Sequence, residues 1–254
     1  VGNWPGVTVE KKAGKYKKNK DIVIVDLPGI YSLSPYTLEE VVSRNYLLDE
    51  TPDVILNMVD ASNIERNLYL TTQMLELNIP VVIALNMMDV VKKRGDKIDT
   101  EKLEKEFGCK IVEVSALRQE GIDTLMSEVE KAASSKKGQK VEFKFSDDVE
   151  QVIEKISNTS SVASSKNKRW TSIKLFERDE KLLETFSFSG DDKSVIENMI
   201  EEVENKLDDD SESIITNERY EVITKIVSSA VDKVKMTMTL SDRIDSIVTN
   251  RILA

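Results

Sequence analysis

The sequence has 254 residues, of which 40% are hydrophobic and 32% are charged, and its formal net charge is −10 at pH 7. It contains no His, which argues against a His general base, a Ser-His-Asp triad and a zinc site. The single Cys, Cys109, excludes an internal disulfide, and no apolar stretch is long enough to span a bilayer. The acidic balance also disfavours nucleic-acid binding, because proteins that bind RNA or DNA normally carry a basic face.

Four short apolar runs in residues 1–137 predict β-strands. They occupy residues 22–25, 54–59, 81–85 and 111–114. Runs this rich in β-branched residues are typical of parallel strands that are buried on both faces. Segments with helical spacing separate them, and Thr37-x-x-Glu40 and Ser62-x-x-Glu65 have the spacing of helix capping boxes. The alternation of strands and helices predicts a doubly wound α/β domain over residues 1–137.

Residues 138–254 have a different pattern, without further runs of this kind. Apolar residues recur with helical spacing in four stripes, at 149–156, 196–203, 223–234 and 240–248. These stripes predict a small all-α helical bundle as a second domain. The polar stretch 157–168 is expected to be a loop within this bundle, and residues 134–140 are expected to link the two domains.

Polar motifs follow three of the predicted strands at their carboxyl ends, where open α/β sheets bind ligands. They are Asp26-Leu27-Pro28-Gly29, Asn86-Met87-Met88-Asp89 and Ser115-Ala116-Leu117. Each motif alone has a simpler explanation. Asp26 suits a turn, Asn86 and Asp89 suit helix caps, and Ser115 suits a cap or a loop. Their order and placement together are what a GTP-binding domain requires, so the sequence predicts a guanine-nucleotide site on a Ras-like GTPase fold.

The second and third motifs are expected to bind the guanine base. The Asp89 carboxylate can accept two hydrogen bonds from N–H groups on one edge of guanine, whereas adenine offers no such pair. Asn86 can tie the loop together and contact the purine. Met87 stands where Lys is usual, so it keeps the apolar cover over the base and loses the positive charge. The backbone N–H groups of residues 115–117 can bind the guanine carbonyl.

The first motif and the opening segment "VGNWPGVTVE" are expected to serve the phosphates. Asp26 can hold Mg²⁺ through water, and the Gly29 N–H can reach the γ-phosphate. Thr8 is placed as a switch threonine that binds Mg²⁺ when the triphosphate is present, so Thr8 and Gly29 are the predicted catalytic residues. A simple turn threonine is the alternative. The predicted nucleotide contacts in this segment are Gly6, Val7, Thr8, Val9 and Glu10.

Several segments resemble the cytosolic amino-terminal part of the ferrous iron transport protein B (FeoB) family. They are "VGNWPGVTVE", "DLPGIYSL", "VDASNIERNLYLT", "ALNMMD" and, at the end of the chain, "SDRIDSIVTNRILA". The resemblance implies a G domain over residues 1–137 and a helical, GDP-dissociation-inhibitor-like domain over residues 138–254. Both would lie on the cytoplasmic face of the membrane, beneath the protein's own Fe²⁺ permease. It further implies GTP and GDP as ligands with Mg²⁺, slow GTP hydrolysis that regulates or drives Fe²⁺ uptake, and homo-oligomers as a further possibility.

Two departures from the GTPase pattern matter. The phosphate-binding sequence G-x-x-x-x-G-K-[ST] does not occur, and the Gly-Lys pair at residues 14–15 lacks the first Gly. The family carries this loop just before "VGNWPG", so we expect the sequence to lack a strand, loop and helix of about 30 residues. Ile30 follows the DLPG motif where Ras-like proteins have a water-orienting Gln. The family shares this lack and uses K⁺ in place of an arginine finger, and Gly2 and Trp4 match the loop whose carbonyls hold that ion.

Two other functions remain open from the sequence. A ribosome- or tRNA-associated GTPase of similar fold would need a basic RNA-binding domain, and the helical half is acidic. A non-catalytic sensor would bind GTP and GDP with negligible turnover, and Ile30 in place of Gln keeps this alternative open. Without the phosphate-binding segment, we expect the α/β half to fold poorly and the chain to bind GTP weakly and to be inactive.

Overall fold

The computed structural model describes residues 2–3, 10–34, 37–135 and 143–234 of the chain. Its strands are β1 (Gly2–Asn3), β2 (Glu10–Lys15), β3 (Val23–Asp26), β4 (Ile55–Asp60), β5 (Val81–Asn86), β6 (Lys97–Ile98), β7 (Lys110–Glu113) and β8 (Val231–Asp232). The helices of the first half are α1 (Leu38–Asn45), a π-helix (Tyr46–Glu50), a 3₁₀-helix (Ala61–Asn63), α2 (Ile64–Leu75), α3 (Met88–Arg94), α4 (Thr100–Phe107) and α5 (Ile122–Ser135). The second half holds α6 (Asp147–Ser157), α7 (Ser160–Ala163), α8 (Lys168–Phe176), α9 (Glu180–Leu183), α10 (Asp192–Leu207) and α11 (Ser211–Ala230).

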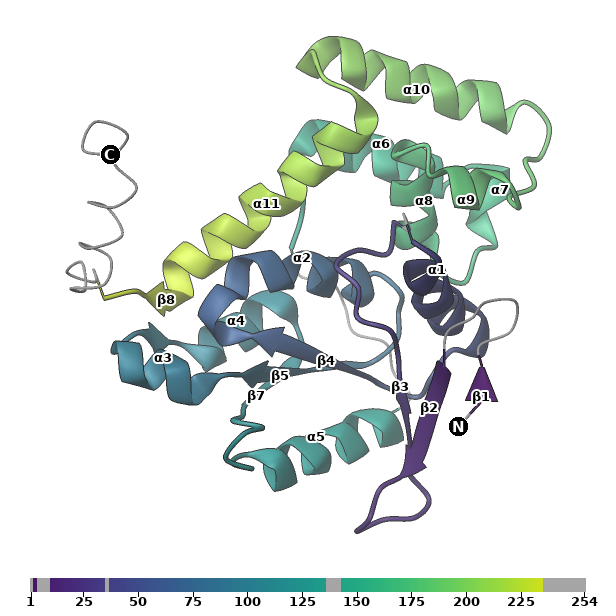
Figure 1. Ribbon diagram of the computed structural model, residues 1–254. Coiled ribbons are helices and arrows are strands. Elements are labelled where there is room, and N and C mark those ends of the chain that lie inside the picture. The colour runs from purple at the N-terminus through teal and green to yellow at the C-terminus, as the bar shows by residue number, and fades with distance from the viewer. Residues whose placement is uncertain (1, 4–9, 35–36, 136–142, 235–254) are drawn as a thin grey trace, which may run out of the picture.

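A parallel sheet in the order β4-β5-β7 forms the centre of the first half. The central strand β5 is buried along its whole apolar run, and no residue from Val81 to Leu85 is more than 1% exposed. Helices α2 and α4 cover one face of this sheet and α5 covers the other (Figure 1). Burial on both faces explains the continuous apolar run of β5, whereas residues of β4 alternate between buried and more exposed positions and Met58 is 49% exposed, so the prediction of two-sided burial is wrong for the run 54–59. Helices on both faces of the parallel sheet confirm the predicted doubly wound α/β architecture.

A second, antiparallel sheet contains β1, β2 and β3, and within the described residues no backbone pairing joins β3 to β4. Figure 1 shows the β2–β3 hairpin running across the direction of β4 and β5. Val23 and Ile24 are 58% and 43% exposed, so the prediction that the run 22–25 is buried on both faces is wrong. The physical reason is that β3 belongs to a separate antiparallel sheet and not to the parallel sheet whose faces the helices cover, so its side chains lack that cover.

The starts of α1 and α2 test the two predicted capping boxes. At α1 both bonds form, because the Glu40 N–H donates to Thr37 Oγ1 at 3.3 Å and the Thr37 N–H donates to Glu40 Oε2 at 3.1 Å. At α2 the prediction is wrong. The carboxylate of Asp60, at the end of β4, accepts the Ser62 N–H at 2.8 Å, and a 3₁₀ turn then places Asn63 at the helix start. A stronger acceptor two residues earlier in the chain has displaced the Ser62 cap.

Three of the four predicted apolar stripes form the core of the helical half. The buried members are Val149, Val152, Ile153, Ile156, Ile196, Ile200, Val203, Ile223, Ile226, Val227 and Ala230. The third stripe ends at Ala230 rather than at Val234, because the chain leaves α11 there to form β8, and Val234 is 53% exposed. The fourth stripe, 240–248, lies outside the described residues.

The stretch 157–168, predicted as a loop, contains the short helix α7, whose Val162 is 0% exposed. The following helix α8 has no apolar stripe in the sequence, although every residue from Trp170 to Phe176 is buried. A helix that is covered on all sides carries no amphipathic signal, so periodicity cannot reveal it. The stretch therefore includes an integral part of the bundle.

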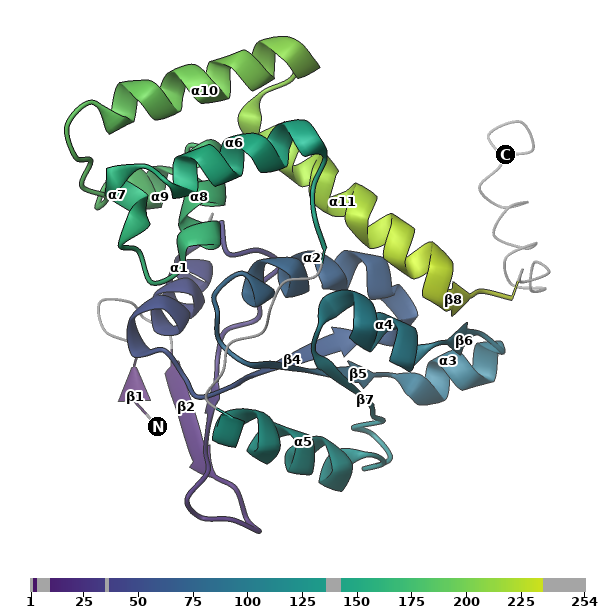
Figure 2. The same cartoon turned by 180° about the vertical axis from the view of Figure 1, so that it is seen from behind.

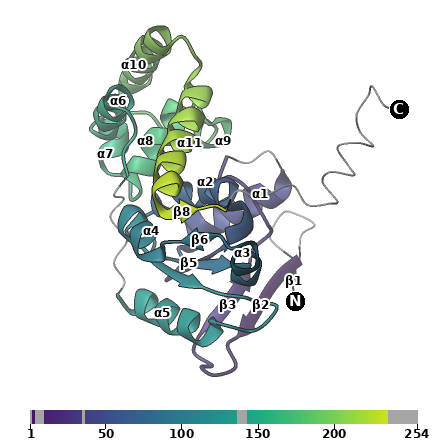
Figure 3. The ribbon, with the colours of Figure 1, turned by 90° about the vertical axis from the view of Figure 1, so that its left-hand side faces the viewer.

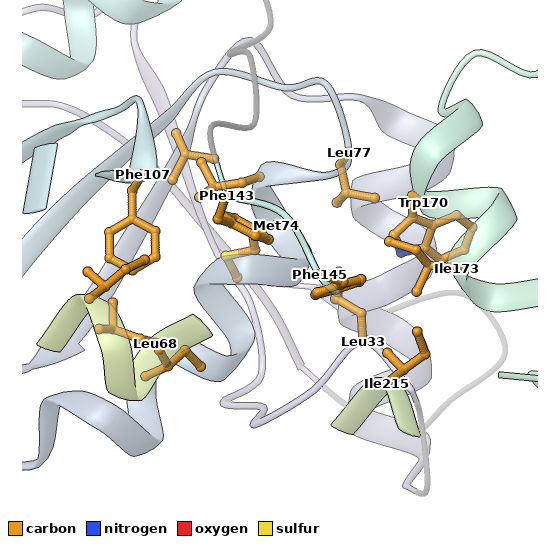
Figure 4. Packing of buried hydrophobic residues seen from close by; sticks show 14 of the residues in the cluster. Leu33, Leu68, Met74, Leu77, Phe107, Phe143, Phe145, Trp170, Ile173 and Ile215 are labelled. Atoms are coloured by element: carbon orange, nitrogen blue, oxygen red, sulfur yellow. The ribbon is translucent and has the colours of Figure 1, made fainter. Parts of the chain in front are cut away.

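One continuous apolar core joins the two halves. Figure 4 shows Leu68 and Met74 of α2 and Phe107 of α4 near Phe143, and Trp170 of α8 further along the same core. The rings of Phe107 and Phe143 meet edge to face, with centroids 6.4 Å apart. This shared core fixes the helical half on the face of the sheet that α2 and α4 cover.

The end of α11 is also held by the first half. Strand β8 pairs with β6 in the register Lys97↔Asp232 and Ile98↔Val231, and Figure 3 shows this pair below α11. The Asp99 N–H donates to the Ala230 carbonyl at 2.8 Å beside it. Among the described residues, no helix combines the length and the apolar character that crossing a bilayer requires.

Candidate functional site

The carboxyl ends of β5 and β7 bring together the residues predicted to bind the base. The Ser115 hydroxyl donates to Asp89 Oδ1 at 3.0 Å, and the Ala116 N–H donates to Asn86 Oδ1 at 3.1 Å. The strands are parallel neighbours, which places the two loops at one edge of the sheet. We call Asn86, Asp89, Ser115 and Ala116 the Asp89 cluster.

The backbone between Asn86 and Asp89 has a specific form. Met87 adopts a left-handed conformation with φ of 65°, which is uncommon outside Gly, and its side chain is 43% exposed. The Met88 N–H donates to the Val114 carbonyl at 3.3 Å and links this turn to the end of β7. Helix α3 starts at once, so Asp89 lies in its first turn, where the positive end of the helix dipole favours a carboxylate.

The Asp89 carboxylate is mostly buried, with a side-chain exposure of 14%. Its Oδ1 accepts the Ser115 hydroxyl, whereas its Oδ2 lies 3.8 Å from Nε of Arg118, a side chain that is 61% exposed. The second oxygen therefore has only a loose, solvent-exposed contact. A ligand with two N–H groups on one edge can pair with this carboxylate by displacing Arg118.

A tight turn closes the loop after β7. Ser115 and Glu120 exchange backbone hydrogen bonds at 3.1 Å in both directions. Gly121 follows with φ of 78°, and a Cβ there would lie 2.2 Å from the Glu113 carbonyl oxygen, so only Gly fits. Leu117 is 88% exposed at the tip of the turn. The structure thus holds Ser115 and Ala116 in the cluster and directs the Leu117 side chain into solvent.

The DLPG motif lies elsewhere. Asp26 and Gly29 are exposed, while Leu27 and Pro28 are partly buried, and the Pro28 carbonyl accepts the hydroxyl of Ser43 at 3.1 Å. Figure 1 shows the carboxyl end of β3 away from the edge where β5 ends. In the described part of the chain, no hydrogen bond or ion pair links this motif to the Asp89 cluster. β3 and β4 are not paired in the described structure, so the DLPG motif follows a strand of a different sheet from the other two motifs.

Most of the opening segment is outside the described residues. This applies to Trp4, Gly6, Val7, Thr8 and Val9. Gly2 and Glu10 are described through their backbone alone, in β1 and β2, where Asn3 pairs with Glu10. The roles predicted for Thr8 and for the K⁺ loop remain predictions.

A polar hollow of about 580 Å³ lies beside the end of β4, lined by Asp60, Asn63, Arg66 and Tyr31 among others. Burial would raise the pKa of Asp60, but hydrogen bonds from Ser62 and Asn63 outweigh it and hold the pKa below its usual value. The Arg66 guanidinium lies 4.3 Å from the centre of the Tyr31 ring. Asp60 and Arg66 therefore share this hollow with Tyr31 of the segment that follows the DLPG motif, and neither was among the predicted site residues.

The segment after DLPG is also tied to the helical half, a connection that the sequence did not predict. Lys174 of α8 donates to the Ser34 hydroxyl at 2.6 Å, and Arg44 of α1 pairs with Asp179 before α9 at 2.9 Å. In the sequence these residues look like ordinary surface charges. Only their burial, which depends on contacts more than 130 residues apart, shows otherwise.

Residues 1–129 match the family "Ferrous iron transport protein B", and residues 145–232 match the family "FeoB cytosolic helical domain". The chain belongs to the FeoB family. A solved relative, a GDP-bound mutant of the S. thermophilus FeoB G-domain, is 44% identical with a TM-score of 0.83, over 91% of this chain and 90% of that one. The structure of mGMPPNP-bound NFeoB from S. thermophilus is 43% identical with a TM-score of 0.79, over 93% of this chain and 89% of that one.

Curated FeoB proteins are also similar to the chain. The Fe(2+) transporter FeoB of Escherichia coli is 32% identical over 100% of this chain and 33% of its own length. The FeoA/FeoB fusion protein of Porphyromonas gingivalis is 39% identical over 100% of this chain and 32% of its own length. The chain thus spans about one third of the FeoB relatives it matches. The predicted Ras-like G-domain fold followed by a helical domain is confirmed.

Proposed function

We propose that this chain is the GTP-binding part of a ferrous iron transporter, in which slow GTP hydrolysis regulates or drives Fe²⁺ uptake. The observation that carries the proposal is the arrangement of Asn86, Asp89 and Ser115 at the carboxyl ends of two adjacent parallel strands. Membership of the FeoB family supports it, as do FeoB relatives solved with GDP and with GMPPNP.

Guanine recognition follows from the hydrogen-bonding capacity of the Asp89 cluster. A carboxylate has about four acceptor positions, and the Ser115 hydroxyl takes one of them on Oδ1. The remaining positions can accept the two N–H groups on the guanine edge. Asn86 uses its Oδ1 to hold the Ala116 N–H, which leaves its Nδ2 group for the purine. Met87, 43% exposed beside them, supplies apolar cover for the ring.

Phosphate binding requires a segment that the sequence does not contain. The motif G-x-x-x-x-G-K-[ST] is absent, and β3 and β4 are not paired with each other in the described structure. A strand inserted between β3 and β4 would complete one sheet and bring Asp26 and Gly29 to the same edge as the Asp89 cluster. Its loop would supply the backbone N–H groups and the Lys that hold the phosphates.

The metal ligands of this proposal are few. Among the described residues, no group of three acidic or Cys side chains could hold a metal ion. Asp26 is a single exposed carboxylate, which suits Mg²⁺, because that ion keeps several waters and takes its other ligands from the nucleotide phosphates. Thr8 would add a ligand with the triphosphate, and the carbonyls of Gly2 and Trp4 would hold K⁺. The whole protein would carry this module, with its helical domain, on the cytoplasmic face beneath its own permease, and homo-oligomers fit such an arrangement.

A second candidate function, a GTP/GDP sensor without turnover, is favoured by one observation. Ile30, which follows Gly29, packs against the apolar core instead of presenting a polar group that could orient water. Single-turnover hydrolysis, measured on the protein with its phosphate-binding segment and with and without K⁺, separates the two. Hydrolysis stimulated by K⁺ supports the enzyme, and no hydrolysis in either buffer supports the sensor.

The decisive variant for the proposed function is Asp89→Asn. Replacing one acceptor oxygen by an NH₂ group inverts the pairing edge, so GTP affinity should fall at least about 100-fold while affinity for xanthosine triphosphate rises. The matched control is Asp21→Asn at an exposed turn, which should leave both affinities unchanged. Calorimetric titration of the protein with its phosphate-binding segment measures this, and parental GTP affinity in Asp89→Asn would show that Asp89 does not read the base.

A further inference from the structure

The turn of the β2–β3 hairpin concentrates positive charge in an otherwise acidic protein. Residues 15–20 read KYKKNK, so four of six positions are Lys and none is acidic, whereas the whole chain has a net charge of −10. We call Lys15, Lys17, Lys18 and Lys20 the lysine tip. All four are exposed.

The lysine tip sits on a built turn. The Tyr16 N–H donates to the Ile22 carbonyl at 3.0 Å, and the Asn19 side chain accepts the Asp21 N–H at 3.1 Å. Tyr16 and Ile22 pack against the apolar cluster that includes Val82 on the central sheet. Apolar side chains therefore face inward from this turn, and the lysines are left to face outward together.

The charge of the lysine tip is hardly neutralised within the molecule. Lys18 pairs with Asp123, and both side chains are exposed, at 65% and 76%. Within the described residues, Lys15, Lys17 and Lys20 form no ion pair. The acid-rich helix α10 lies at the other end of the molecule from the hairpin, as Figures 1 and 2 both show. The molecule is thus electrically polarised, with one compact basic projection.

We propose that the lysine tip binds the anionic phospholipid surface of a membrane. Ammonium groups are compact point charges without the planar fork of Arg, so they suit a diffuse layer of lipid phosphates better than a single shaped anion. Each Lys near such a surface contributes about 1 kcal/mol, so four provide a usable anchor even against the repulsion from the acidic remainder. The proposed placement beneath a permease guides the choice of partner, whereas the clustering of charge does not depend on it.

Two other partners fit the structure less well. A second copy could offer its acidic α10 to the lysine tip, but the two surfaces lie at opposite ends, so this head-to-tail contact would build open chains instead of a closed dimer. RNA binding normally adds aromatic side chains on which bases stack. Tyr16, the aromatic residue within the turn, is partly buried and packs inward. Binding to a bilayer requires neither a closed oligomer nor aromatic side chains that stack on bases.

The test is binding to vesicles without any nucleotide, so its outcome is independent of the GTPase proposal. The chain is floated with vesicles of phosphatidylcholine alone and with about one third phosphatidylglycerol, at about 0.1 M salt. We expect at least about tenfold more binding to the anionic vesicles and its loss near 1 M salt. The variant Lys15→Gln, Lys17→Gln, Lys18→Gln, Lys20→Gln should lose at least about tenfold, since four charges near the surface are removed.

A matched control variant has the same net charge as the variant with four Gln residues in the lysine tip. The variant Lys93→Gln, Lys105→Gln, Lys155→Gln, Lys225→Gln also changes the net charge from −10 to −14, because it too removes four positive charges, all at exposed positions elsewhere. It should bind the anionic vesicles within about twofold of the parent, and replacing the four tip lysines by Arg should preserve binding. Circular dichroism confirms that each variant is folded.

Three results of the vesicle comparisons would overturn the proposal, and a fourth would come from a competition experiment. These are equal binding to neutral and anionic vesicles, equal losses in the two Gln variants, and tighter tip-dependent binding to a short RNA or to a second copy at the same salt. Soluble glycerol phosphate is included as a competitor. Its failure to displace the protein at millimolar concentration is expected of a surface that needs many phosphates at once, and effective displacement would point to a single-anion site instead.

Discussion

Arg44 and Asp179, which are 135 residues apart in the sequence, form a buried ion pair between the segment after DLPG and the helical half. Arg44 Nη1 donates to both carboxylate oxygens at 2.9 Å, and each side chain is 5% exposed. The guanidinium also lies 5.1 Å from the centre of the Trp170 ring and donates to the Leu33 carbonyl at 3.3 Å. The position of α1 is therefore set partly by residues of the other half.

Removing one member of this pair should destabilise the protein strongly. Asp179→Asn keeps the oxygen that caps α9 but leaves the Arg44 charge unpaired, and we expect a loss of about 3–5 kcal/mol in the free energy of unfolding. The pair Lys181–Glu184 is the control, because its side chains are 49% and 59% exposed and Glu184→Gln should cost at most about 1 kcal/mol. Urea unfolding measures both, and equal costs would mean that solvent reaches the Arg44 pair.

The apolar stripe of α11 should tolerate no charge. Ile226 is 4% exposed, so Ile226→Asp should bury an unpaired carboxylate and cost several kcal/mol, on the order of 3 or more. Val195→Asp on α10 is the matched control, since Val195 is 41% exposed and should change stability by less than about 0.5 kcal/mol. Thermal unfolding distinguishes them, and a parental midpoint for Ile226→Asp would show that this face of α11 is a partner surface.

Gly121 should be irreplaceable in the loop after β7. In Gly121→Ala the new methyl group would meet the Glu113 carbonyl at 2.2 Å at a φ of 78°, so the loop that holds Ser115 must shift. We expect a loss of about 1–3 kcal/mol and weaker guanine-nucleotide binding in the protein with its phosphate-binding segment. Gly14→Ala, with no atom within 4 Å of the new methyl group, should be close to neutral. Unaltered binding in Gly121→Ala would show that the loop accommodates the change elsewhere.

Glu150 should contribute to acid sensitivity of the helical half. Burial would raise its pKa, but the paired hydrogen bonds from Arg169 at 2.7 and 2.8 Å outweigh burial and lower the pKa below 4.5. Its contribution to stability is therefore fully present above about pH 4.5, the unfolded value, and is lost as the pH falls through the lower folded value. Glu150→Gln should lower stability at pH 7 and flatten the fall below pH 4.5. The exposed Glu154→Gln on the same helix should leave the curve unchanged, and identical curves for both variants would contradict this assignment.

The sequence predicted the elements that have a periodic or local pattern of residues. It did not predict the features that depend on contacts between residues far apart in the chain. The runs at 54–59, 81–85 and 111–114 form the parallel sheet, and the continuous apolar run of the central strand reflects its burial on both faces. The sequence did not predict the hydrogen bond between Ser115 and Asp89, although the rule that neighbouring parallel strands end at one edge explains why these two residues lie together. Helix α8 was not predicted because it is covered on all sides and so has no amphipathic pattern. The burial of Arg44 was not predicted because its partner Asp179 lies 135 residues later in the sequence.

The position of the DLPG motif relative to the Asp89 cluster could not be predicted from the sequence, for a related reason. The position of Asp26 depends on which strand lies beside β3, and that pairing is absent from the described structure. Periodicity correctly marked 22–25 as a strand, but the exposure of Val23 at 58% reflects the lack of a neighbour and could not be read from the run itself. A strand can be predicted from its own residues, whereas the burial of its side chains depends on the whole sheet around it.

The pairing of β6 with β8 has a mechanical consequence. Its two-residue register, the bond from the Asp99 N–H to the Ala230 carbonyl, and the bond from the Val234 N–H to Asp96 Oδ1 at 2.9 Å all lie where the described chain ends. A pull on the chain beyond Val234 would therefore load these bonds before it reached α11. They join the pulled end to the stretch between α3 and α4, and Asp89 lies in the first turn of α3. Tension at this end of the molecule would thus reach the Asp89 carboxylate through α3, without passing through the helical bundle.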